Sequence, residues 1–117
     1  MWHIETTETF DTWFGALDDT DRANVLASML VLRERGPMLP RPYADTVKGS
    51  SFNNMKELRV QSKGDPIRAF FAFDPKRKGI LLCAGNKTND EKRFYEVMIP
   101  IADREFTLHL KQLQQSK

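Results

Sequence analysis

Cysteine, histidine and long apolar runs are all scarce in this chain of 117 residues. The single cysteine, Cys83, rules out an internal disulfide and suggests a reducing compartment. No apolar run approaches the roughly 20 residues that span a bilayer. The N-terminus carries acids where a signal peptide has basic residues, and it has no apolar core. We therefore expect a cytoplasmic protein that does not act at a membrane.

Several kinds of chemistry are also excluded by what is missing. The two histidines, His3 and His109, stand nearly a chain length apart, and no acidic cluster has the spacing of metal ligands. There is no glycine-rich nucleotide-binding motif. No histidine lies near Cys83 to activate it, so this thiol is expected to be a small buried hydrophobe. We expect no metal and no cofactor.

The size and composition are those of an ordinary globular protein. The chain length predicts one domain over residues 1–117. Apolar residues make up 40% and charged residues 29% of the sequence. Such a chain can bury a core without disulfides or metals.

Positive charge is concentrated in the middle of the chain. Residues 48–95 hold eleven Lys and Arg against five Asp and Glu, a balance of +6, whereas the whole chain is only +2. The first 21 residues hold six acids and no Lys or Arg. A basic segment of this kind suggests a polyanionic partner that contacts the middle of the chain.

The N-terminal third predicts a short strand followed by a helical hairpin. Residues 2–5 alternate apolar and polar side chains, and Thr7 is placed to cap a first helix. That helix would carry an aromatic stripe, which either forms a partner surface or, as such stripes usually do, faces the core: Phe10, Trp13, Phe14 and Leu17. Residues 18–21 break it and cap a second helix, which should end at Arg35 before Gly36 and Pro37. The residues expected to face inward are Ala23, Leu26, Met29 and Leu30, with Val25 and Leu32 as further candidates.

The middle of the chain predicts an irregular connector and a three-strand meander. The connector covers residues 36–54, where Lys48 and the polar run after it either reach a ligand or simply cross the surface. The strands are expected at 56–61, 67–73 and 80–84, joined by turns at 62–66 and 75–79. Arg59 and Arg68 should then lie nearly opposite each other. An anion between them would relieve their repulsion; the alternative is that each extends into solvent.

The last helix is predicted to begin at a second anion-binding position. Thr88 and Glu91 have the spacing of a capping box. Lys87, Lys92, Arg93 and Tyr95 would gather around the helix N-terminus, whose free N–H groups favour an anion. Pro100 should kink or split the helix. The predicted fold is thus α+β: a small, mostly antiparallel sheet packed by an N-terminal helical hairpin and a C-terminal helix.

Lys, Arg, Glu and Tyr around a phosphate suffice for RNA cleavage. RNA carries its own nucleophile, the 2′-hydroxyl, so the protein needs only to move protons and stabilise the charge on phosphorus. Lys and Arg can stabilise that charge. A Lys, Glu or Tyr can move the protons, and the sequence leaves open which residue does so.

Three segments together resemble the RelE/HigB family of bacterial toxins. They read KELR at 56–59, RAFFAF at 68–73 and KRFYE at 92–96, and the resemblance extends over nearly the whole chain. It implies the RelE-like fold and an mRNA endoribonuclease that commonly works in the ribosomal A site. It also implies a helix-turn-helix antitoxin of the HigA type, through which alone the toxin would meet operator DNA.

The resemblance also suggests which residues would act. The family's functional positions carry over to six residues: Arg59, Arg68, Lys87, Lys92, Arg93 and Tyr95. Further RNA contacts are expected from Lys48, Lys56, Glu57, Lys63, Lys76 and Arg77, although the run at 75–79 is also typical of a solvated turn. Some members use a histidine near the C-terminal end of the site, and this chain has none there.

Two other functions remain open on the same sequence. A ParE-type toxin of this superfamily would poison DNA gyrase, and a non-catalytic module would hold RNA or a protein without cutting.

Overall fold

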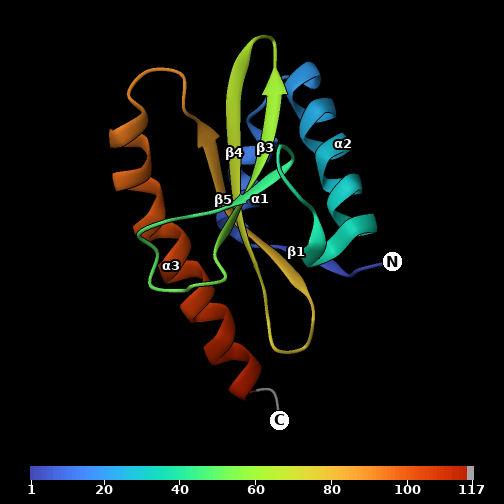
Figure 1. Cartoon of the computed structure of the whole chain (residues 1–117), viewed down its shortest axis with the longest axis vertical. Helices are drawn as coiled ribbons and strands as arrows, with labels where there is room; N and C mark the ends of the chain where they lie inside the picture. The colour runs from blue at the N-terminus through green and yellow to red at the C-terminus, as the bar shows by residue number, and fades with distance from the viewer. Residues whose placement is uncertain (116–117) are drawn as a thin grey trace.

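The computed structural model describes residues 1–115, and these form a five-stranded sheet with helices on both faces (Figure 1). The elements in chain order are β1 (Ile4–Thr6), α1 (Glu8–Gly15), α2 (Asp19–Arg35), a 3-10 turn η1 (Gly36–Met38), β2 (Ala44–Thr46), β3 (Lys56–Ser62), β4 (Asp65–Phe73), β5 (Gly79–Asn86) and α3 (Glu91–Gln115). The strand order is β1-β5-β4-β3-β2, with β1 parallel to β5 and every other pair antiparallel. The predicted α+β class is confirmed.

One face of the sheet packs against α1 and α2. Strand alternation turns Leu58, Val60, Ile67 and Ala69 to this side, where they meet Phe10, Val25 and Leu32 from the helices. Three members of the predicted aromatic stripe, Phe10, Trp13 and Phe14, contact one another here. The stripe is therefore core, as predicted.

The other face packs against α3, and a β-bulge shapes it. Phe70 pairs with Cys83 but Phe71 pairs with Leu81, so β5 has one extra residue at this point. The bulge turns both Leu82 and Cys83 towards α3, where they are buried with Ala102 and Phe106. Burial raises the pKa of the Cys83 thiol to about 12, so the thiol stays protonated and inert, as expected of a buried hydrophobe.

The β3–β4 hairpin places Arg59 opposite Arg68, close to the expected register, although its turn is shorter than the predicted 62–66. Its two-residue turn, Lys63-Gly64, has positive φ at both positions, the type I′ geometry whose twist suits a hairpin. This turn pairs Arg59 directly with Arg68. Because both side chains point away from Leu58 and Val60, they lie on the α3 side of the sheet.

Two sequence-based expectations about the sheet were wrong. The connector over 36–54 is not wholly irregular, since it contains η1 and the edge strand β2. Strand β2 is only three residues long and depends on its pairing with β3 (Ala44 with Leu58), so local alternation gave no signal. The first strand also begins two residues later than predicted, at Ile4.

The inward face of α2 also differs from the expectation. Val25 and Leu32 are buried, whereas Ala23, Leu26 and Leu30 are exposed, Leu30 to 57%. Two side-chain hydrogen bonds to β3 fix the rotation of α2 about its axis. Ser62 Oγ donates to Asp21 Oδ1 (2.5 Å) and accepts from Asn24 Nδ2 (2.9 Å). Both tied residues lie on the side of α2 that carries Val25.

At α3 the expected capping box and helix break are absent. Thr88 bonds back to the Asn86 side chain, and Asp90 Oδ1 accepts from Arg93 N (3.1 Å) instead. The helix runs unbroken through Pro100, so it is not split. Pro100 lies on an exposed face, where water can satisfy the carbonyl that the proline leaves free. No helix within residues 1–115 is long and apolar enough to cross a bilayer.

Candidate active site

Three side chains from three different elements meet on the α3 side of the sheet: Glu57 from β3, Arg68 from β4 and Tyr95 from α3. Glu57 is 7% and Arg68 5% exposed. Arg68 Nε lies 4.0 Å from Glu57 Oε2, and the Tyr95 hydroxyl donates to Glu57 Oε1 at 2.6 Å. Strand register explains the meeting, because Glu57 pairs with Phe70 and Arg59 with Arg68. Glu57 and Arg68 are thus diagonal neighbours on one face.

The guanidinium of Arg68 is incompletely satisfied. Its Nη1 donates to the Ile67 carbonyl (3.0 Å), but the buried Nε has no hydrogen-bond partner among residues 1–115. A buried donor without a partner costs roughly 1–3 kcal/mol, and native structures rarely leave one. Because Nε is closed to solvent, an anion would supply the missing acceptor only if the guanidinium turned outward.

Tyr95 is held in its protonated form. Burial, followed by the hydrogen bond to the Glu57 carboxylate, keeps the pKa of the phenol well above its ordinary value. Tyr95 can therefore donate a proton at neutral pH, but it cannot act as the base.

Lys87 supplies a second positive charge next to Tyr95. Its Nζ lies 3.4 Å from the Tyr95 hydroxyl, 5.3 Å from the ring centroid and 3.1 Å from Glu91 Oε1. The side chain is only 12% exposed. The backbone holds it there, since Lys87 N donates to the Pro66 carbonyl (2.9 Å) just beyond the paired part of β5.

An open groove leads to this cluster. It has a volume of about 280 Å³, and it is lined by Thr46, Val47, Lys48, Glu57 and Tyr95. Lys48 belongs to residues 47–55, the strap, which leaves β2, crosses to α3 and returns to β3 (Figure 1). The strap thus places a third cation beside Glu57 and Tyr95.

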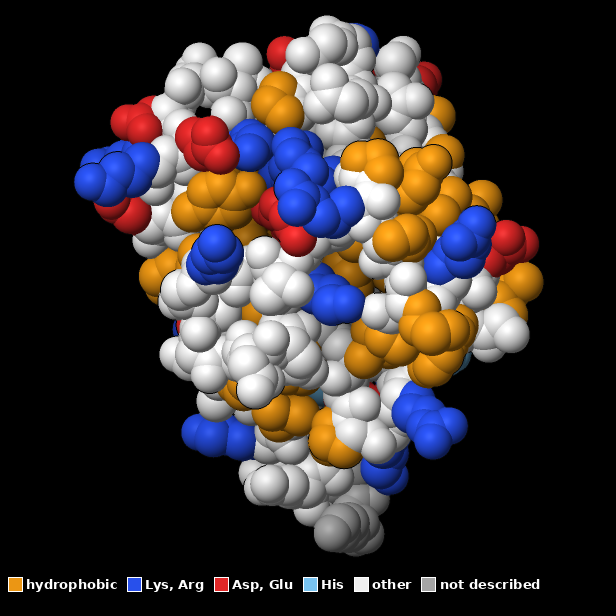
Figure 2. Space-filling view, in the orientation of Figure 1, with side chains coloured by type: hydrophobic (Ala, Val, Ile, Leu, Met, Phe, Trp, Pro, Cys, Tyr) orange, Lys and Arg blue, Asp and Glu red, His pale blue; other side chains and the backbone are white. Residues whose placement is uncertain are grey.

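Other predicted site residues lie at the border of this cluster. Arg59 is half-buried opposite Arg68. Lys92 and Arg93 are exposed in the first turn of α3, and Lys92 lines a neighbouring groove with Tyr95. Figure 2 shows Lys and Arg side chains gathered over the middle of this face, with apolar surface beside them.

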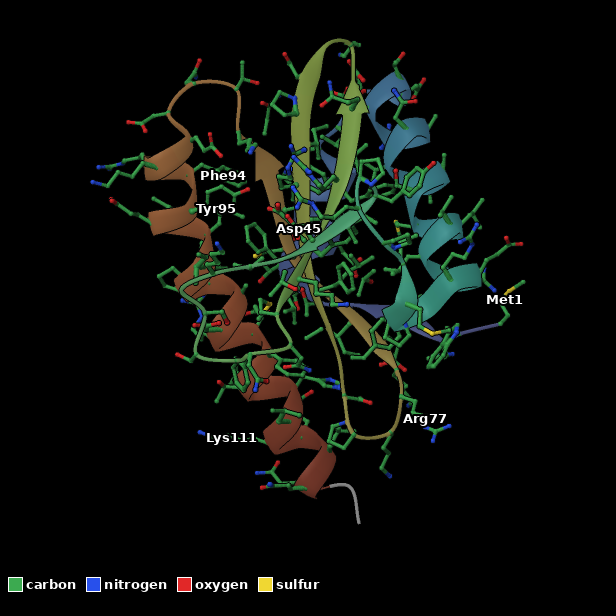
Figure 3. All side chains as sticks on the ribbon, viewed as in Figure 1. Met1, Asp45, Arg77, Phe94, Tyr95 and Lys111 are labelled. Carbon is green, nitrogen blue, oxygen red and sulfur yellow. The ribbon has the colours of Figure 1, made fainter. Side chains whose placement is uncertain are left out.

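Four predicted RNA contacts lie away from the cluster. Lys56 turns to the helical-hairpin side, where its Nζ donates to the Pro37 carbonyl (2.9 Å). Lys63 pairs with Asp18 and Asp21 at the start of α2. Lys76 and Arg77 lie in the β4–β5 turn, at the opposite end of the strands from Lys87. Figure 3 shows Arg77 far from Tyr95.

The residues that fix the strap and the first turn of α3 were not predicted. Asp103 accepts from Ser50 Oγ (2.5 Å) and from Ser51 N (2.9 Å). These partners are more than 50 residues apart, so no local pattern joins them. Asp90 caps α3. Aspartate is itself a favoured N-cap residue, so this cap could have been predicted by considering every Asp, Asn, Ser and Thr before the helix, and not only the Thr88–Glu91 pair.

The described residues contain no ready metal site. Within residues 1–115, no three His, Cys, Asp or Glu side chains come together so as to hold an ion. His109 instead bonds to Asp74 Oδ2 (2.7 Å), and His3 bonds to Glu5 (2.9 Å). Neither histidine belongs to the Glu57–Arg68–Tyr95 cluster.

Comparison with known proteins decides the family. Residues 12–107 match the phage-derived Gp49-like family (DUF891). The chain is 43% identical over 111 residues to HigB2 of Mycobacterium tuberculosis, and 47% identical over 94 residues to HigB3 of the same organism, both named as candidate toxins. The chain belongs to the HigB-type toxins of the Gp49-like family.

The extent of these matches differs. The HigB2 alignment covers 94% of this chain but 55% of HigB2, so the chain spans about half the length of that relative. The HigB3 alignment covers 80% of this chain and 81% of HigB3. Among solved structures, a double mutant of the Escherichia coli toxin RelE in the free state matches with a TM-score of 0.56. That match covers 77% of this chain and 87% of RelE at 11% identity, and it shows that the fold is RelE-like.

Proposed function

We propose that this HigB-type protein is the toxin of a type II toxin–antitoxin system and acts as an mRNA endoribonuclease that inhibits translation. The observation that carries the proposal is the buried Arg68 guanidinium with its unpartnered Nε, next to Glu57, Tyr95 and Lys87. A scissile phosphate that draws the Arg68 guanidinium outward would satisfy the orphan donor and place its charge between two cations.

The cluster can supply every proton transfer of RNA cleavage. The Glu57 carboxylate takes the proton of the 2′-hydroxyl, whose oxygen attacks phosphorus. Arg68 and Lys87 stabilise the charge that builds on the phosphoryl oxygens. The P–O5′ bond breaks, and Tyr95, protonated because of its raised pKa, gives its proton to the leaving 5′-oxygen. The products are a 2′,3′-cyclic phosphate and a 5′-hydroxyl.

The hydrogen bond between Tyr95 and Glu57 then resets the site. After one turnover Glu57 holds a proton and Tyr95 lacks one. At 2.6 Å between their oxygens, the proton can return directly from carboxyl to phenolate. No group outside the cluster has to titrate, and the nucleophile belongs to the RNA, so we propose that the reaction is independent of metal.

Cleavage of a translated message tests the proposal. Ribosomes programmed with a defined mRNA in Mg²⁺ buffer should yield fragments with 2′,3′-cyclic phosphate ends, and any cleavage of free RNA should persist in EDTA. Free RNA tested in parallel decides the ribosome dependence. Arg68→Ala and Tyr95→Phe should each lower the single-turnover rate by about 10²-fold or more. Lys76→Ala, far from the cluster, is the matched cation control.

Each alternative function has its own outcome in this experiment. If messages stay intact while induced cells accumulate DNA double-strand breaks, the protein is a gyrase poison of the ParE type. If RNA is bound but no cyclic phosphate ends form, with or without ribosomes, the protein is a binding module.

We also propose a cognate helix-turn-helix antitoxin of the HigA type that neutralises the toxin in the cytoplasm and alone connects it to operator DNA. Family membership supports this partner. Co-expression with the product of the adjacent reading frame should give a complex that co-purifies and restore growth. Failure of any neighbouring product to do so would contradict it.

A further inference from the structure

A second groove runs beside the proposed cleavage site and shares Tyr95 with it. Its volume is about 400 Å³, and it lies between the strap and the first half of α3. It is lined by Gly49, Lys92, Tyr95, Glu96, Ile99 and Pro100. The α3 residues follow the i, i+3, i+4, i+7 spacing, so they form one continuous face of the helix.

The wall that the strap contributes is anchored at several points. Asp103 holds Ser50 and Ser51 to α3 through two hydrogen bonds. Phe52 packs edge-on against Phe106, with ring centroids 4.9 Å apart. Met55, at the far end of the strap, is fully buried and accepts from Val47 N (2.9 Å). The groove is thus preformed rather than created by a loose loop.

Gly49 keeps the groove open on the strap side. Its φ is +92°, a conformation that L side chains rarely adopt, and a Cβ there would lie 3.9 Å from Ile99 Cδ1. Any larger side chain would therefore extend into the groove. Glycine leaves the apolar surface of Ile99 and Pro100 accessible from the strap side.

The chemistry of the lining fits a flat aromatic ring with hydrogen-bond donors on its edge. Ile99 and Pro100 offer apolar surface, Tyr95 adds an aromatic ring, and the exposed Glu96 carboxylate offers two acceptors. Unstacked RNA bases are recognised in this way, by stacking on side chains and by hydrogen bonds to their edges. Lys92 at the same groove suits the phosphate that follows the base.

We propose that this groove is a nucleobase subsite that binds the base next to the cleaved phosphate and prefers guanine. Guanine presents two adjacent donors, N1–H and the exocyclic amino group, and both can pair with the two oxygens of Glu96. Uracil and adenine lack this pair. The inference rests on the proposed RNA cleavage, because it assigns the base specificity of that same site.

Oligonucleotides with one cleavable bond test the subsite. Each is a deoxyuridine strand with a single ribonucleotide, so only the phosphate after that ribose can be cut. The position before the phosphate and the position after it are varied one at a time. At the varied position the base is guanine, hypoxanthine or missing. With the wild-type protein, on programmed ribosomes if free RNA is not cut, guanine at one position should give about ten-fold faster cleavage than hypoxanthine, which lacks the amino group.

Two variants and one control separate recognition from folding. Glu96→Gln, an exposed isosteric change, should abolish the preference for guanine over hypoxanthine, because the amide keeps one acceptor for N1–H but has no second acceptor for the exocyclic amino group. Ile99→Ala should weaken binding of base-containing strands but not of the abasic strand. Val97→Ala lies on the same helix, is 48% exposed and does not line the groove, so it should behave as wild type.

The outcomes distinguish this inference from the function on which it rests. Cleavage at equal rates for guanine, hypoxanthine and the abasic position, or discrimination that survives Glu96→Gln, would overturn the subsite and leave the ribonuclease intact. If wild-type protein neither binds nor cuts any strand, on or off the ribosome, both proposals fail together.

Discussion

Tyr95 is the residue that the parts of the candidate site have in common. Its hydroxyl donates to Glu57, lies near Lys87 and sits at the junction of both grooves. Its ring packs at right angles to Phe70 and Phe94, which limits its rotation. A phenol fixed in this way can act only as a proton donor, because burial and Glu57 both oppose its ionisation.

The raised pKa of Tyr95 can be observed directly. In a Tyr43→Phe variant Tyr95 is the sole tyrosine, so tyrosinate absorbance reports on it alone. We expect little absorbance at about pH 10, where a free tyrosine is half ionised, as long as the protein stays folded by circular dichroism. Half ionisation near pH 10 in the folded state would contradict the assigned role. Stability should fall above that pH, because the unfolded state releases the proton first.

At the scale of elements, one buried pair ties the β4–β5 turn to the C-terminal half of α3. Asp74 accepts from Lys76 N (2.8 Å), Lys78 N (3.0 Å) and His109 Nε2 (2.7 Å). Burial raises the pKa of Asp74, but the hydrogen bonds from His109 and the two backbone N–H groups outweigh it and hold the pKa below its usual value. The charged carboxylate is therefore the form that the fold stabilises.

Asp74→Asn should lower the free energy of unfolding at pH 7 by about 1–3 kcal/mol. Because the folded-state pKa is below the unfolded one, this stabilisation is present above about pH 4 and is lost as the pH falls through the folded-state pKa. Urea denaturation of both proteins at pH 7 and near pH 3 should show the difference shrinking in acid. Glu34→Gln, exposed on α2, should have little effect. An equal loss at both pH values would mean that charge is not involved.

The hairpin turn between β3 and β4 offers a clean test of backbone strain. Gly64 has φ +82° and Gly15 at the end of α1 does not have positive φ, yet a Cβ at either meets nothing within 4 Å. Gly64→Ala should therefore destabilise by about 1–2 kcal/mol, whereas Gly15→Ala should be neutral or slightly stabilising. Chemical denaturation of the two variants measures this. Equal effects would show that strain in the turn does not matter.

Local patterns predicted those elements whose signals are contained within a few residues. The two strands expected on either side of a turn at 62–66 placed Arg59 nearly opposite Arg68, and the spacing of Phe10, Trp13 and Phe14 gave the buried stripe. On α2, by contrast, two apolar faces compete. Val25, Met29 and Leu32 have helical spacing just as Leu26 and Leu30 do, and distant ties to Ser62 decide between them.

In the candidate site too, local patterns predicted some neighbours and missed contacts between residues that are distant in the sequence. Arg68, Lys87 and Tyr95 were predicted neighbours, and strand register brings them together with Glu57. Lys56 fails to join them because strand alternation sends it to the other face, although it is adjacent to Glu57 in sequence. The strap's bonds to Asp103 join residues that no periodic pattern relates. The catalytic roles themselves remain predictions.

At the scale of the whole molecule, the Tyr95 cluster and most of the exposed large hydrophobic side chains lie on different sides of the sheet. Tyr95 and its cations lie on the side of α3, while Met1 and α2 lie on the opposite side of the sheet (Figure 3). The exposed large hydrophobics include Leu26, Leu30 and Val31 of α2, with Met38 and Tyr43 just after it. The basic residues at the two ends of the strands are likewise separate, although the sequence joins them in one basic segment.

This separation predicts which cations RNA contacts. If RNA follows the grooves at Tyr95, Lys48→Ala and Lys92→Ala should each reduce the slope of log K against log salt by about 0.7, the value for one phosphate contact on a single strand. The Lys76→Ala/Arg77→Ala double variant removes two charges from the distant β4–β5 turn and should leave the slope unchanged. Fluorescence anisotropy with an RNA whose cleavable ribose lacks its 2′-hydroxyl measures these slopes without turnover.

A larger reduction of the salt slope in the double variant than in either single variant would contradict this prediction. It would mean that the RNA extends along the strands to the far turn, where it contacts Lys76 and Arg77. A long RNA and a strand of a few nucleotides would then differ, because only the long one could reach both ends of a molecule that measures 44 Å along its longest axis.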